Sequence, residues 1–412
     1  MIGPRLFHRN WSNRVEAAGT IGAIMNYRGS RPRRRALFPR PLLLCAVFAV
    51  LATLFFAEVV PRYAPGLLRF EHVLGDVRTS YLSDRLPSQH PHIAIVSISD
   101  ETLKDSKVRQ PIDRAILARL VEAVDSAGAK VIGIDILSAR TPPPDNEEDF
   151  IEAIKKARAP VVLGAADERV GLPKADLDHQ AKFIGKTGRP AGYINLATER
   201  DWVVRFRAQP MEGSRYPKSF AAQLAEKFGV RPDVSFRRIA WLLEPLDRSD
   251  VFLTIPAELL LSGSGPAVDS ARAGLKDKIV IIGALFQDID RHVTPLSARA
   301  GELQPGPVIH AHLTAALIDG RHIAQLETES LALKLSLLAI AAVAFLIGWY
   351  FRFTSQGLLL GSVATVAIIA MDTFVFWYWR IILPIVLALL AWFLGEFTGR
   401  YIGRLLGPRR VI

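Results

Sequence analysis

Four long apolar runs constrain this chain of 412 residues more than any other feature. They cover residues 41–60, 331–350, 358–379 and 381–399. Each has about the 20 residues that an α-helix needs to cross the hydrocarbon core of a bilayer. The sequence therefore predicts four transmembrane helices, with one large domain over residues 61–330 between the first and the second.

A cleaved signal peptide is the alternative interpretation of the first run. The apolar core of a signal peptide has about 7–15 residues and ends at a small-x-small cleavage site. The run at 41–60 is longer, and Phe55-Phe56-Ala57 places a large residue where a small one is required. We therefore expect an uncleaved membrane anchor.

The positive charge of the chain is concentrated beside the apolar runs. The net charge is +11, and residues 1–40 hold nine arginines and one acidic residue, whereas residues 61–330 hold 35 basic and 36 acidic residues. Cationic segments remain on the cytoplasmic side of a membrane. The basic tails 1–40 and 400–412 therefore predict cytoplasmic termini and an extracytoplasmic domain in a bacterial inner membrane. The lipid bilayer is the implied partner, and the neutral domain argues against nucleic acid.

The domain between the first and second runs alternates strand and helix patterns. Residues 92–99 and 130–137 are apolar strands rich in β-branched side chains, and residues 113–127 have apolar side chains at helical spacing. Such a unit predicts a right-handed crossover and an α/β domain with a mainly parallel sheet. The other expected elements are helices at 147–157, 217–228 and 307–318, strands at 160–165, 191–197, 203–208, 251–255 and 279–284, a surface loop at 166–190 and a turn at 262–265.

Charged residues follow the predicted strands, where parallel sheets place their ligand sites. Asp100 and Asp135 lie at the ends of the first two strands, and Asp290 follows a later one. Arg114 and His310 each lie at the start of a predicted helix. We predict that these five residues converge on a ligand pocket in which the acids pair with Arg114. Helix capping is the alternative role for the acids, and catalysis is the least favoured.

Motifs of common enzymes were not found. There is no HExxH, no GxGxxG after a strand, no P-loop lysine and no GxSxG. His310 and His312 are two residues apart on a predicted helix and therefore suit a shared metal poorly. We expect no catalytic residue, no metal site and no cofactor, and we predict that the chain is not an enzyme.

The apolar runs contain a few polar and many small residues. Asp372 and Lys334 are expected to make polar contacts between helices or to reach the interface, and an ion pathway is less favoured. Cys45 is the only cysteine, which excludes an intramolecular disulfide. Small residues predict close helix association, as a homo-oligomer or with a membrane enzyme. They are Ala339, Ala341, Ala342, Ala344, Gly361, Ser362 and Ala364.

Several short motifs follow one another along the domain. They include Asp76-Val77-Arg78, a G-A-x-V-I-G-x-D strand ending at Asp135, and a Pro305-Gly306-Pro307 helix start before His310. Together they resemble the CHASE type 2 (CHASE2) extracellular sensor domain family, over about residues 65–330 and the membrane arrangement. One departure is the segment from Gln110 to Arg114, which lacks the tryptophan of the family's aromatic motif.

The resemblance implies an integral-membrane sensor that binds an extracytoplasmic signal or partner and relays the change through its spans. Members of the family usually continue into a cytoplasmic enzyme domain. Here 13 residues follow the last run, so we expect the output to belong to a separate protein. A structural or scaffold subunit of a membrane complex is the alternative, and an extracytoplasmic hydrolase is less favoured.

Overall fold

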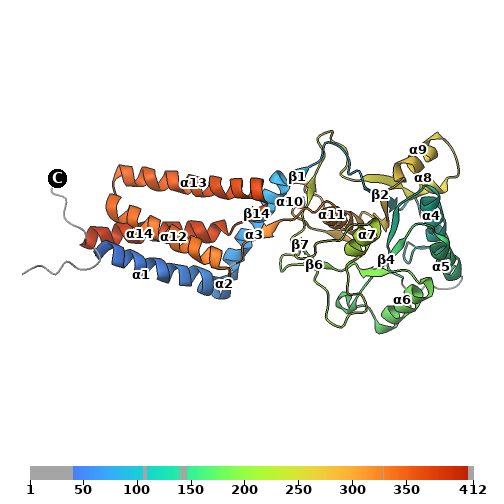
Figure 1. Cartoon of the computed structure of the whole chain (residues 1–412), viewed down its shortest axis with the longest axis horizontal. Coiled ribbons are helices and arrows are strands. Elements are labelled where there is room, and N and C mark those ends of the chain that lie inside the picture. Colours follow the sequence, from blue (N-terminus) through green and yellow to red (C-terminus); the bar gives the residue numbers. More distant parts are fainter. Residues whose placement is uncertain (1–39, 105–108, 139, 141–145, 328, 407–412) are drawn as a thin grey trace, which may run out of the picture.

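The computed structural model describes residues 40–104, 109–138, 140, 146–327 and 329–406. Of the predicted basic tails 1–40 and 400–412, residues 1–39 and 407–412 lie outside these described residues. The molecule is elongated, with a bundle of long helices at one end and an α/β domain at the other (Figure 1). The helix α3 (Pro65–Leu82) lies between the two parts.

Four helical segments of the described chain are long and apolar enough to cross a membrane. They are Pro41–Tyr63, Leu331–Phe351 (α12), Ser355–Trp379 (α13) and Ile385–Leu406 (α14). The first combines α1 (Arg40–Leu54), a π-helical turn η1 (Phe55–Val59) and α2 (Val60–Tyr63). These helices fit a multi-pass membrane protein, as predicted.

The last span begins and ends later than the apolar run at 381–399. The short strand β14 (Ile381–Ile382) precedes it, and α14 continues to Leu406. Arg400, which the sequence places in the tail, is therefore a buried residue of the helix. It forms an ion pair with Glu396 one turn earlier, and its Nη2 donates to the carbonyl of Gly357 at 2.8 Å.

Glycines allow α14 to pack closely against α12. A Cβ atom added to Gly399 would lie 2.1 Å from the Phe345 carbonyl oxygen, and one added to Gly403 would lie 2.8 Å from that of Trp349. With Gly395, these residues repeat every four positions, a spacing typical of close helix pairs in membranes. Ala341 on α12 is fully buried in the same contact. Ala341, one of the small residues that we expected to serve association, therefore packs within the chain.

The α/β domain contains a six-stranded sheet of order β5-β4-β3-β10-β2-β9 in which every neighbouring pair is parallel. This confirms the predicted mixed fold with a mainly parallel sheet. The strands are β2 (Ile93–Ile98), β3 (Val131–Asp135), β4 (Val161–Ala165), β5 (Ala191–Tyr193), β9 (Leu253–Pro256) and β10 (Ile279–Ala284).

Helices cover both faces of the sheet, because alternate strand residues point to opposite sides. Val96 and Ile282 pack with one group of helices, and Ile95 and Ile281 pack with the other. The first group is α4 (Arg114–Ser126), α5 (Glu147–Lys156), α6 (Lys174–Thr187), α8 (Ala257–Leu261) and α9 (Pro266–Leu275). The second is α7 (Phe220–Phe228) and α11 (Gly306–Ile318).

Two helices differ from the sequence prediction. Residues 166–190 were expected to form a loop, but they contain α6, whose few core contacts include the buried Phe183. The turn at 262–265 leads directly into α9, because Pro266 suits the first position of a helix. The smaller elements are η2 (Glu168–Val170), α10 (Ser297–Ala300), β1 (Asp84–Arg85), β6 (Leu196–Thr198), β7 (Val204–Arg207), β8 (Leu242–Leu243), β11 (Arg291–His292), β12 (Gln304–Pro305) and β13 (Ala324–Gln325).

Candidate functional site

A cavity of about 510 Å³ lies at the carboxyl ends of the adjacent central strands β3 and β10. Parallel sheets place their ligand sites at this edge. Asp135, Asp290 and Gln110 are the polar side chains of its wall. The rest of the lining is Pro111, Ile112, Ile136, Leu137, Ile194, Ala284, Phe286 and Ile289. The mainly apolar wall with a few polar groups is typical of small-molecule sites.

Asp135 is the last residue of β3 and lies beside Gly283 of β10. Its Oδ2 atom is buried and has no hydrogen-bond partner among the described residues. Burial, together with the nearby carboxylate of Asp290, raises the pKa of Asp135 well above its ordinary value. The cavity therefore contains a carboxyl group whose hydrogen-bonding capacity the fold leaves unused.

Asp290 reaches the same cavity from the loop after β10, with a left-handed backbone of φ 55°. Its Oδ1 lies 2.8 Å from Nε2 of His292. A Cβ atom added to Gly306, the first residue of α11, would lie 2.1 Å from the Asp290 Oδ2 atom, so glycine leaves the room that this carboxylate occupies. The Asp290 side chain is about half exposed, and its partial desolvation opposes ionisation, but the His292 ring, the charge of His310 and the Gly306 N–H lower the pKa of Asp290.

His310 lies on the second turn of α11 and is buried. Its ring packs edge-on against Phe220 at a centroid distance of 5.6 Å, and its Nδ1 atom has no hydrogen-bond partner among the described residues. Burial lowers the pKa of His310 to about 4, although the negative charge of Asp290 opposes this shift. Asp135, Asp290 and His310 therefore form one group of interacting residues at the end of the sheet.

The other two predicted site residues lie elsewhere. Asp100 pairs with Arg109, whose Nε atom is 2.6 Å from it and which also binds Asp288. Arg109 stacks over Phe286, so this exposed cluster adjoins the cavity wall. Arg114 is buried and forms an ion pair with Glu147 at the start of α5. The predicted pairing of Arg114 with the strand-end acids is therefore wrong, because a carboxylate on the next helix occupies its guanidinium.

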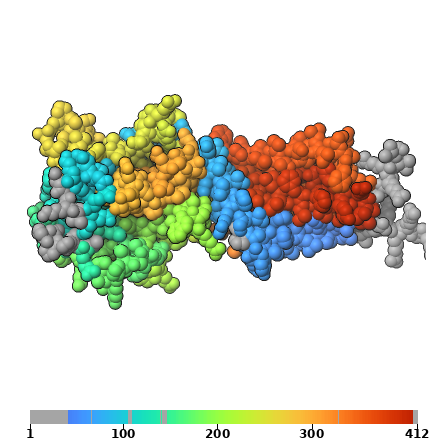
Figure 2. Space-filling view, turned by 180° about the vertical axis from the view of Figure 1, so that it is seen from behind, coloured from blue at the N-terminus to red at the C-terminus, as the bar shows by residue number. Residues whose placement is uncertain are grey.

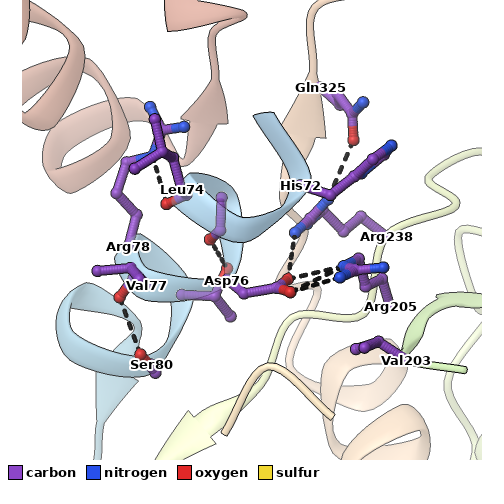
Figure 3. A network of polar contacts seen from close by, with 12 residues as sticks. His72, Leu74, Asp76, Val77, Arg78, Ser80, Val203, Arg205, Arg238 and Gln325 are labelled. Atoms are coloured by element: carbon purple, nitrogen blue, oxygen red, sulfur yellow. Dashed lines mark hydrogen bonds and ion pairs between the residues drawn. The ribbon is translucent and has the colours of Figure 1, made fainter. Parts of the chain in front are cut away.

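A second polar cluster joins the domain to α3, close to the membrane helices. Asp76 on α3 accepts hydrogen bonds from Arg205 of β7, at 2.7 Å from Nη2, and from Arg238, at 3.3 Å (Figure 3). Nη1 of Arg238 donates to Gln325 of β13 at 3.1 Å. Asp76 and both arginines are buried, so these ions depend on one another for charge compensation. Burial lowers the pKa of Arg238 to about 10, which leaves it charged at neutral pH.

The same helix also contacts the membrane bundle. Arg78, two residues after Asp76, forms a buried ion pair with Asp372 of α13. Glu71 accepts a hydrogen bond from the Leu387 N–H in the first turn of α14 at 2.9 Å. Near the end of α3, Asp84 pairs with Arg380, and β13 pairs in parallel with β14 between the last two spans. The helix α3 therefore binds the domain and the spans at once.

Sequence reasoning placed Asp76 and Arg78 in a family motif but did not assign their partners. Arg205 and Arg238 are 129 and 162 residues away from Asp76 in the chain, and no local pattern connects such distant residues. The spacing of the motif did carry a signal, since residues i and i+2 of a helix point in different directions. Asp76 faces the domain and Arg78 faces the bundle.

Comparison with known proteins identifies the family. No curated protein and no solved structure matches this chain. The family model described as the CHASE2 domain matches residues 46–349, which include α3, the whole sheet and most of α12. CHASE2 is a sensor-type domain family, in agreement with the mixed α/β fold and the four apolar helices. The chain belongs to the CHASE2 domain family.

Proposed function

We propose that this protein is a membrane sensor that binds a small molecule in the cavity at β3 and β10. The observation that carries the proposal is the buried Oδ2 atom of Asp135, which has no hydrogen-bond partner among the described residues and belongs to a residue of an accessible cavity. Buried polar atoms in folded proteins are nearly always paired. A ligand that donates a hydrogen bond to this oxygen would complete the site.

The lining indicates the chemical class of the ligand. Two carboxyl groups, Asp135 and Asp290, lie among isoleucine, leucine and phenylalanine side chains. This combination suits a small amine, with an ammonium group for the carboxylates and an apolar part for the walls. A cation beside Asp135 favours its ionised form. Because the pKa of Asp135 is raised in the free protein, binding of an ammonium ion is expected to release a proton.

A continuous set of contacts leads from the cavity to the membrane helices. The 13 residues of α11 span about 20 Å. The helix begins beside Asp290, and the chain that follows it reaches β13, where Gln325 binds Arg238 and Arg238 binds Asp76 on α3. In our proposal, occupancy of the cavity shifts α11, and α3 passes this shift to the spans.

The proposed location and output follow from the sequence. The arginine-rich termini favour a bacterial inner membrane with cytoplasmic termini and a periplasmic or extracellular sensor domain. We propose that the spans act on a separate membrane enzyme or on a second copy of the chain. The alternative, a scaffold subunit, requires no ligand in the cavity.

A calorimetric titration tests the ligand-binding proposal. Purified full-length protein is titrated with butylamine and phenethylamine in two buffers of different ionisation enthalpy. We expect at least one amine to bind with release of a proton. Asp135→Asn and Asp290→Asn should each weaken binding by about 10- to 100-fold, because a charge-assisted hydrogen bond contributes about 1.5–3 kcal/mol. The matched control is Asp288→Asn, on the exposed cluster beside the cavity, which should bind normally.

Two results would count against this site. If the amines bind the Asp135→Asn and Asp290→Asn variants as tightly as the original protein, the carboxylates do not form the site. If neither amine gives any binding heat in either buffer, the scaffold alternative gains support.

A further inference from the structure

The helix α3 has an unusual distribution of side chains. Five of its large apolar residues are exposed: Phe70 by 63%, Val73 by 52%, Leu74 by 40%, Val77 by 42% and Tyr81 by 59%. Their spacing of three and four residues places them along one face of the helix. We call this face the α3 stripe. A water-soluble helix would bury such a face, so the stripe requires a non-aqueous neighbour.

Outside the stripe, the second half of α3 is polar and buried on several sides. Asp76, Arg78, Thr79 and Ser80 are all buried. Asp76 and Arg78 form ion pairs with the domain and with α13, and the Thr79 and Ser80 hydroxyls donate to backbone carbonyls of α3. Rotating the helix to bury the stripe would break these ion pairs and leave buried charges uncompensated. The orientation of the stripe is therefore fixed by the structure.

The contacts of α3 place it at the depth of the outer turns of the spans. Its ion-pair partner Asp372 lies seven residues before Trp379, the end of α13, a distance of about 10 Å along the helix. The exposed aromatic residues Trp377 and Tyr378 lie in that interval, and such residues are typical of the membrane interface. Figure 2 shows α3, in blue, uncovered across the end of the bundle that faces the domain.

We propose that the α3 stripe inserts into the outer membrane interface, so that lipid is its occupant. The stripe is at the level of the aromatic end of α13, where lipid surrounds the bundle. Exposed arginines lie at both ends of α3, namely Arg62 and Arg69 before the stripe and Arg85 after it. Cations beside an apolar face are typical of interfacial helices, because they interact with lipid phosphates. The inference rests on the membrane spans and is independent of the cavity.

Depth-dependent quenching tests this inference. Val77→Cys is introduced into a Cys45→Ala background, labelled with bimane and reconstituted in nanodiscs that contain phosphatidylcholine brominated near the headgroup end of its acyl chains. Glu122→Cys on α4, an exposed residue of the domain, is the aqueous control, and Phe374→Cys near the aromatic end of α13, exposed by 46%, is the lipid control at matching depth. We expect quenching at position 77 to exceed that at position 122 by at least threefold and to approach that at position 374.

Two outcomes would overturn the proposal. Quenching at position 77 equal to that at position 122 would place the stripe in water. Efficient disulfide crosslinking of Val77→Cys between two chains before labelling would show that a second copy covers the stripe. Val73→Cys on the same face repeats the measurement, which guards against a local folding defect at position 77.

Discussion

Asp76→Asn is expected to lower the free energy of unfolding of the α/β domain by about 3–5 kcal/mol, the usual effect of removing one partner from a buried ion pair. The carboxylate of Asp76 binds two buried guanidinium groups, those of Arg205 and Arg238. Arg205 also binds Glu199 and Asp201, but these carboxylates are each about one-third exposed. An asparagine leaves part of the buried positive charge without compensation.

Asp201→Asn is the matched control, because it removes another partner of Arg205 that lies outside α3. Asp201 is about one-third exposed, so it contributes less than Asp76 and this variant should lose no more than about 1 kcal/mol. Chemical unfolding in mild detergent, followed by tryptophan fluorescence, measures both values. An Asp76→Asn variant as stable as Asp201→Asn would show that the cluster on α3 does not hold the domain in place.

Acidification from pH 6.5 to pH 4 is expected to destabilise the domain by about 3 kcal/mol through His310 alone. Burial lowers the pKa of this histidine from 6.5 to about 4 in the folded protein. Between these values the unfolded chain takes up a proton at His310 and the folded chain does not. The contribution of neutral His310 to the free energy of unfolding is therefore fully present above pH 6.5 and is lost as the pH falls toward 4.

Other groups near His310 also titrate, so the prediction concerns the difference between two proteins. Asp290 and His292 face the same site, burial lowers the pKa of His312 to about 3, and the raised pKa of Asp135 gives a slope of opposite sign. Unfolding free energies of the original protein and of His310→Gln are compared at each pH. Their difference should change by about 2 kcal/mol between pH 6.5 and pH 5. A constant difference would refute a buried neutral His310.

The sequence was informative where a pattern is local and repeated. Four apolar runs correspond to the four candidate spans, and the β-branched segments correspond to the parallel sheet. Asp135 and Asp290 were placed together because the ends of neighbouring parallel strands meet at one edge. The helix α6 was missed because its apolar face is sparse, with Phe183 as its only fully buried large side chain.

The side-chain contacts that were not predicted join separate parts of the chain, and no local sequence pattern specifies such pairs. Arg114 pairs with Glu147, 33 residues later in the chain, and Asp100 pairs with Arg109, nine residues later, and neither partner was among the predicted site residues. The cluster around Asp76 joins residues from three separate parts of the domain. The glycine repeat of α14 was visible in the sequence, but its partner helix was not.

Hydrogen exchange of the protein in nanodiscs tests most directly whether α3 couples the spans to the α/β domain. Coupling between two sites is reciprocal. A change in a membrane helix should therefore alter the stability of the α/β domain. Asp372→Asn breaks the contact of α13 with Arg78. Lys334→Gln is the matched control, since it breaks an ion pair with Glu58 that lies within the bundle and does not involve α3.

We predict that Asp372→Asn increases the amide exchange of β7, which lies on the domain side of α3, by at least tenfold, whereas Lys334→Gln leaves this strand unchanged. Equal exchange in the two variants and in the original protein would contradict coupling through α3.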